Sequence, residues 1–123
     1  MREENIQYFT ESEEKFANLL IDIGMKKNIA RLLVFFANTP EATSRQIERG
    51  IDIRQPEVSI AIRYLTGQNW IACKEIPSER KGRPQKSYSL AIPLNDIIAA
   101  IEKEKEEKAN NLLSRVNKMR DFL

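Results

Sequence analysis

The sequence contains no histidine and a single cysteine, Cys73. Protein zinc sites are built mainly from cysteine and histidine, so a metal centre of this kind is excluded. Nucleophilic catalysis that needs a histidine base is excluded for the same reason. The four glycines are isolated from one another, which rules out a glycine-rich phosphate loop. These absences predict a non-enzymatic protein without a cofactor. A hydrolase that uses two carboxylates is an open alternative, although no such pair stands out.

Long apolar runs are also absent. No stretch approaches the roughly 18 residues needed to cross a bilayer. The first ten residues carry acids and lack the apolar core of a signal peptide. A length of 123 residues, with 41% hydrophobic and 31% charged residues, is typical of one small globular domain. We therefore expect a cytoplasmic protein that has no membrane partner.

Charge is distributed unevenly along the chain. Residues 43–90 hold nine lysines and arginines against five acids, whereas the remainder holds eleven against thirteen. The middle of the chain is therefore basic and its ends are acidic. A nucleic-acid-binding face between two helical flanks is expected to produce this asymmetry.

Helical periodicity predicts two helices at the start of the chain. Thr10 and Glu13 form a capping-box pattern that opens the first helix. Gly24 is expected to end it. The second helix spans about residues 26–38 and is apolar nearly all round, which predicts a central core helix.

Two further helices joined by a turn are predicted next. Thr43 and Gln46 repeat the capping-box pattern and open a short helix that we expect to end at Gly50. After a turn at 51–53, Pro56 is expected at the first position of another core helix, where its missing N–H is harmless. The inner stripe predicted for this helix is Val58, Ala61, Ile62 and Leu65.

The pattern then changes to that of strands. Residues 70–76 and 86–90 are strand candidates around a polar, basic loop. A long helix is expected to begin after Pro93 and to continue to about Asp121.

The predicted fold is mostly α (α+β). It is a winged helix-turn-helix with a two-stranded β-hairpin wing and a long C-terminal helix. We expect a DNA-binding domain over residues 1–92 and a dimerisation helix over residues 93–123.

The helix order predicts double-stranded DNA as the partner. In a helix-turn-helix unit the first helix crosses the phosphate backbone and the second enters the major groove. Gln55 can pair with adenine, Arg63 with guanine, and an exposed Ile60 with a thymine methyl group. Arg45, Arg49 and Arg54 can bind phosphates. The predicted DNA-binding residues are Arg45, Arg54, Gln55, Glu57, Ser59, Ile60, Arg63, Arg80, Lys81, Arg83 and Lys86.

The basic loop is the predicted wing. It places four cations around Gly82, and these can lie along the DNA backbone or in a minor groove. A solvated loop without a partner is the alternative interpretation. More broadly, a winged-helix module that binds an acidic protein or RNA, without specific duplex binding, stays open.

These segments resemble a known family. Residues 54–65 read Arg-Gln-Pro-Glu-Val-Ser-Ile-Ala-Ile-Arg-Tyr-Leu, and a glycine and a Trp-Ile pair follow. This run is similar to the recognition helix of ArsR-, MarR- and TrmB-type winged-helix transcription regulators. Lys-Gly-Arg-Pro at 81–84 and Tyr-Ser-Leu at 88–90 resemble their wing and second strand. The resemblance covers roughly residues 30–90. It implies a winged helix that binds DNA. Metal-sensing members of the ArsR type use cysteine and histidine ligands, which this sequence nearly lacks, so the resemblance does not imply a metal sensor.

Apolar residues at both ends of the chain predict a homodimer. The last helix carries two apolar patches separated by the charged run 102–108, and the second patch needs a partner to bury it. We expect the first and last helices to form the contact, with a small apolar effector at the dimer interface left open. The predicted dimerisation residues are Phe16, Leu20, Ile98, Ile101, Leu112, Leu113, Val116 and Met119.

Four residues are expected to have packing roles. Trp70 should plug the junction between helix and strand, and Tyr64 and Tyr88 should pack rather than stack on bases. Cys73 is expected to be a small buried residue in a strand.

Overall fold

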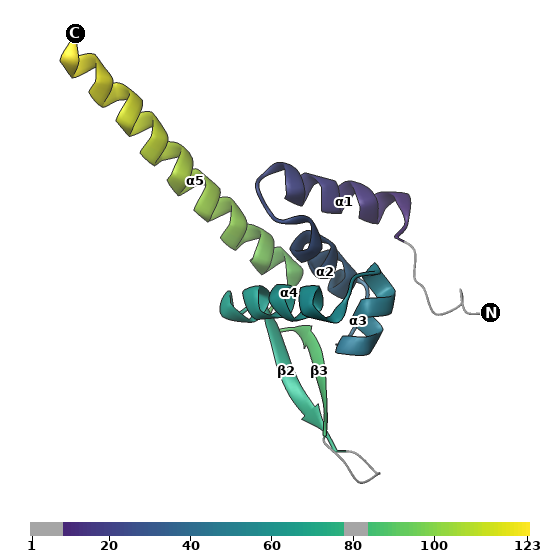
Figure 1. Ribbon diagram of the computed structural model, residues 1–123. Coiled ribbons are helices and arrows are strands. Elements are labelled where there is room, and N and C mark those ends of the chain that lie inside the picture. Colours follow the sequence, from purple (N-terminus) through teal and green to yellow (C-terminus); the bar gives the residue numbers. More distant parts are fainter. Residues whose placement is uncertain (1–8, 78–83) are drawn as a thin grey trace. The chain divides into compact units, whose positions relative to one another are not determined.

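The computed structural model describes residues 9–77 and 84–123. The chain divides into two compact units, Met1–Ile92 and Pro93–Leu123. The first contains four helices and three strands among its described residues, and the second is one long helix with a final turn (Figure 1). The elements are α1 (Glu11–Asp22), α2 (Lys27–Ala37), β1 (Ala42–Thr43), α3 (Ser44–Ile51), α4 (Gln55–Gly67), β2 (Ile71–Ile76), β3 (Gln85–Leu90), α5 (Leu94–Met119) and the 3-10 turn η2 (Arg120–Phe122).

Helix α2 is the centre of the first unit. It packs against α1, α3 and α4, and seven of its eleven residues are buried. A helix that is apolar nearly all round can only be stable when other elements cover every side. The prediction of a central core helix over this segment is confirmed.

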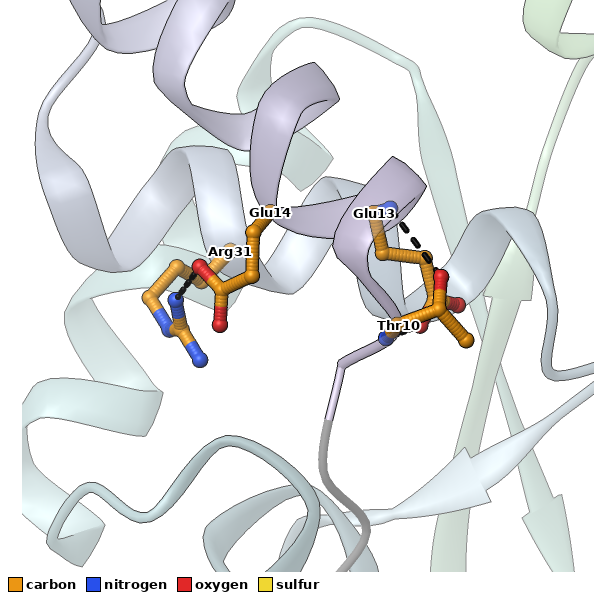
Figure 2. A network of polar contacts seen from close by, with 4 residues as sticks. All are labelled: Thr10, Glu13, Glu14 and Arg31. Atoms are coloured by element: carbon orange, nitrogen blue, oxygen red, sulfur yellow. Dashed lines mark hydrogen bonds and ion pairs between the residues drawn. The ribbon is translucent and has the colours of Figure 1, made fainter.

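Helix α1 begins with the predicted capping box. The Thr10 hydroxyl accepts a hydrogen bond from the Glu13 amide at 3.1 Å, and the Glu13 carboxylate accepts one from the Thr10 amide at 2.7 Å (Figure 2). In the same view, the guanidinium of Arg31 on α2 lies 3.1 Å from the Glu14 carboxylate. This ion pair joins α1 to α2, although partial exposure keeps its contribution to stability small. Gly24, at φ 109°, then redirects the chain.

Helix α3 also begins as predicted. Thr43 and Gln46 form the second capping box, with bonds of 3.3 and 2.8 Å. The helix ends at Ile51, one residue after the predicted Gly50, which is buried in its last turn. Asp52 takes the left-handed conformation after the helix, at φ 57°. An aspartate tolerates this conformation better than most residues because its short side chain can bond locally.

Helix α4 buries the predicted stripe. Val58, Ala61, Ile62 and Leu65 are all buried. Pro56 occupies the second helical position rather than the first, where its missing N–H still falls among the four that have no partner within the helix. After the helix, Asn69 at φ 65° turns the chain, and the buried Trp70 fills the junction as expected.

The sheet has three antiparallel strands in the order β1–β3–β2, one more than predicted. The additional strand, β1, has only two residues, which pair with Tyr88 and Ser87. Two residues are too few to show a period, so only the pairing reveals the strand. Within β2 only Ile71 is buried. The expectation that Cys73 is buried was therefore wrong, because the strand extends beyond the core after its first residue.

The second unit confirms the long C-terminal helix. Helix α5 has 26 residues, of which Ile97 and Ile101 are buried. Its second apolar patch is exposed, with Leu112 at 60% and Met119 at 64% relative exposure. Along the described residues, no helix combines the length and the apolar content that crossing a bilayer requires.

Candidate nucleic-acid interface

A short turn fixes where α4 starts relative to α3. The Ile53 amide donates to the carbonyl oxygen of Glu48 at 3.3 Å. The Arg54 amide donates to the carboxylate of Glu57 at 3.1 Å. These bonds satisfy backbone groups at the helix junction, which otherwise lack partners. Glu57 was predicted as a DNA-binding residue, and the structure gives its carboxylate a capping role.

The outward face of α4 follows from its buried stripe. At 100° per residue, the side opposite the stripe carries Pro56, Ile60 and Arg63. Ile60 is 59% exposed although it is a large apolar residue, and Arg63 is exposed. Fully burying an isoleucine side chain gains about 1.5–3 kcal/mol, so part of that gain is still available at Ile60.

Gln55 and Ser59 flank this face on one side. The Gln55 amide donates a hydrogen bond to the Ser59 hydroxyl at 3.0 Å, one helical turn away. Gln55 is exposed and Ser59 is half-buried. The bond holds the amide nitrogen of Gln55 against the helix and thereby orients its side-chain carbonyl oxygen.

Tyr64 lies on the other flank. The expectation that Tyr64 packs rather than stacks on bases stays a prediction. Its side chain is 41% exposed. The reason is its place in the helix, since it precedes the buried Leu65 and is turned 100° away from it. Tyr88, by contrast, is half-buried in the central strand.

Exposed cations also occur on α3, in the turn before α4 and on β3. Arg45 and Arg49 on α3 and Arg54 in the turn are exposed. Lys86 is exposed on β3, opposite Glu75 of β2. The predicted wing residues Arg80, Lys81 and Arg83 lie outside the described residues.

A hollow beside Ile60 adds two lysines that the sequence interpretation missed. Its volume is about 260 Å³, and Lys26 and Lys27 before and at the start of α2 line it together with Glu57, Ile60 and Ala61 of α4. The Lys-Lys pair is visible in the sequence, but it lies outside the basic segment 43–90. Only the packing of α2 on α4 brings it next to the outward face.

The predicted dimerisation residues divide into two groups. Leu20 and Ile101 are buried within the single chain, and Phe16 is half-buried. The exposed large apolar residues in this part of the chain are instead Leu19 on α1 and Ile23, which directly follows the helix. The remaining predicted dimerisation residues are exposed, and these are Ile98, Leu112, Leu113, Val116 and Met119.

Comparison with known proteins identifies the fold. No family model matches the sequence, and no curated protein matches it. Among solved structures, one described as a possible transcriptional regulator from Methanosarcina mazei Go1 is similar, with a TM-score of 0.68 and 14% identity over 81% of this chain and 83% of that one.

Two other solved structures are also similar. One is a transcriptional regulator, with a TM-score of 0.55 and 16% identity over 81% of this chain and 65% of that one. The other is a mutant of MepR from S. aureus, with a TM-score of 0.52 and 18% identity over 85% of this chain and 76% of that one. At these identities the similarity concerns the fold, and it confirms the fold that the sequence resemblance implied. The chain is a winged helix-turn-helix protein.

Proposed function

We propose that the protein is a transcription regulator that binds specific sequences in double-stranded DNA. The observation that carries this proposal is the outward face of α4, where Ile60 and Arg63 project from a helix whose inner stripe is completely buried. The two solved structures described as a transcriptional regulator and a possible one support the same role. The protein acts in the cytoplasm, without enzymatic activity or a cofactor.

Helix α4 reads bases in the major groove. Arg63 has the planar fork that binds both acceptors of guanine, and Gln55 has the amide that matches adenine. Ile60 offers an apolar surface to a thymine methyl group. Ile60 and Arg63 lie on the outward face of α4, and Gln55 flanks that face near the start of the helix, so together they can reach neighbouring base pairs.

Cations on other elements bind the phosphates and set the position of α4. Arg45 and Arg49 come from α3, and Arg54 from the turn. Lys26 and Lys27 adjoin Ile60 from the start of α2, so they approach the duplex beside the base-reading helix. Lys86 on β3 contributes with the wing residues Arg80, Lys81 and Arg83. Contacts of this kind supply affinity without sequence preference.

The protein binds DNA as a homodimer. The exposed patch on α5 requires a partner, since contiguous apolar residues in water are unfavourable. A two-fold dimer presents two copies of α4 to half-sites about one helical turn apart. The exposed apolar residues available to a second copy lie on α1, directly after it and on α5. They are Leu19, Ile23, Ile98, Leu112, Leu113, Val116 and Met119.

Selection from a random duplex pool tests the proposal. The full chain, incubated with the pool at low salt, should enrich a sequence with two related half-sites. Fluorescence anisotropy with the enriched duplex, a scrambled duplex and a single-stranded RNA then measures specificity. Failure to bind any duplex at low salt would contradict the proposal, and binding of RNA alone would identify the protein as an RNA-binding module.

A further inference from the structure

Glu41 precedes β1 and contacts two other strands. Its Oε1 atom accepts a hydrogen bond from the Ser87 hydroxyl on β3 at 3.0 Å. The same oxygen lies 3.5 Å from the Lys74 ammonium group on β2. Ser87 and Lys74 are direct partners across β2 and β3, and Ser87 also pairs with Thr43 of β1. One carboxylate oxygen therefore joins the segment before α3 to both strands of the hairpin.

Of these two contacts, the bond from Ser87 is the stronger restraint. Ser87 is 3% exposed, and a buried hydroxyl needs a hydrogen-bond partner. A charged acceptor makes that bond stronger than one between neutral groups. The ion pair with Lys74 is exposed, at 69% for the lysine and 51% for the glutamate side chain. An exposed pair contributes little by itself.

Besides these bonds, the hairpin is held at one end, where Ile71 of β2 is buried and residues 87–90 of β3 are buried or half-buried. Beyond Ile71, the rest of β2 is exposed. The strand β1, which pairs with β3, has only two residues, and β3 also contacts α2 and α3 directly. Thr43 of β1 is also the N-cap of α3. A shift of the hairpin along β1 therefore changes the position of the hairpin relative to the helix-turn-helix unit.

We infer that Glu41 is a positioning residue that fixes the β2–β3 hairpin against the start of α3. The consequence for DNA binding rests on the function proposed above. In the DNA-bound protein, Glu41 sets the distance between the phosphate-binding cations of the hairpin, such as Lys86, and the base-reading face of α4. Glu41 itself contacts no base.

Amide hydrogen exchange of the free protein tests the positioning without DNA. In Glu41→Ala, the amides at the β1–β3 pairing should exchange about tenfold faster or more, while those of α4 keep their rates. Glu41→Gln keeps an acceptor for Ser87 and should restore most of the protection. Glu75→Ala removes an exposed carboxylate from the same hairpin and serves as the matched control. Unchanged exchange at β1–β3 in Glu41→Ala would overturn the inference.

Two further measurements keep the test decisive. If Glu41→Ala does not fold, Ser87→Ala removes the same bond from the other side and should give the same local effect. With the selected duplex, Glu41→Ala should lower the salt dependence of binding and leave discrimination between base sequences intact. Loss of discrimination instead would contradict a positioning role for the hairpin. If the wild type binds no duplex, the proposed function fails, whereas the exchange result still decides the inference.

Discussion

Gly50 lies against the ring of Phe35 so closely that a Cβ at this position would overlap the ring. Gly50 belongs to α3 and Phe35 to α2, and both residues are buried. The missing side chain therefore sets how near the first helix of the helix-turn-helix unit approaches the core helix.

Substitution of this glycine should destabilise the fold. In Gly50→Ala the new methyl group must push Phe35 or α3 aside, which costs about 1–3 kcal/mol by the usual penalty for overpacking. Gly67→Ala is the matched control, since a Cβ there meets no atom within 4 Å. Because alanine favours the helix, Gly67→Ala should leave stability unchanged or raise it by up to about 1 kcal/mol. Urea unfolding measures both, and equal stability of the two variants would contradict the packing argument.

Ser59→Ala should weaken recognition by Gln55. The substitution removes the acceptor 3.0 Å from the Gln55 amide, so the side chain loses the bond that orients it. At about 0.5–1.5 kcal/mol for one hydrogen bond, the selected duplex should bind roughly twofold to tenfold more weakly. Thr66→Ala removes an exposed hydroxyl from the same helix and should have little effect. Anisotropy titrations measure the difference, and equal affinities in the two variants would contradict this role.

Arg63→Ala and Arg45→Ala should have different effects on specificity. Arg63 is on the outward face of α4, so its removal should cost about 1–3 kcal/mol of binding free energy with the preferred duplex. It should also reduce the sequence preference at one base pair. Arg45 on α3 is expected to bind phosphate, so its loss should weaken all duplexes alike. Binding to a set of single-base variants of the selected site distinguishes the two outcomes. If Arg63→Ala lowers the affinity for all variants of the site equally, the base-reading role of Arg63 is contradicted.

Removal of both lysines beside Ile60 should reduce the salt dependence of binding. The double variant Lys26→Gln/Lys27→Gln should lower the log–log slope by about 1.8, at about 0.9 for each phosphate that is no longer neutralised. Lys103→Gln/Lys118→Gln removes the same amount of charge from α5 and should change the slope much less. Titrations at several salt concentrations measure the slopes. If the two double variants have the same salt slope, Lys26 and Lys27 do not contact the duplex.

Charge placed in the exposed patch of α5 should prevent dimerisation. Leu112→Glu/Val116→Glu introduces two carboxylates at side chains that are 60% and 46% exposed, so the single chain can tolerate them. Sedimentation at micromolar concentration should show a dimer for the wild type and a monomer for this variant. Asn110→Glu, outside the patch residues on the same helix, should remain dimeric. A monomeric wild type would contradict the proposed assembly.

Local patterns in the sequence predicted most of the helices correctly. The capping boxes at Thr10 and Thr43 involve residues three apart, and the inner stripe of α4 repeats within a single helix. Such features depend on neighbours along the chain, so the sequence contains all the information they need. The long C-terminal helix and the hairpin were predicted for the same reason.

Features that depend on distant residues were decided by packing. Gly50 looks like a helix end in the sequence, and only the approach of Phe35 gives it another role. The strand β1, the exposed Cys73 and the lysines beside Ile60 likewise follow from which segments meet in space.

The sequence by itself thus determined the order of the helices and of the two hairpin strands, and the inner stripe of α4, because backbone propensity and side-chain periodicity act within a few residues. Only the tertiary structure decided which cations adjoin the outward face of α4 and how Glu41 joins the hairpin to α3. Contacts between residues such as Glu41 and Ser87, 46 positions apart, exist only after the core has brought their elements together.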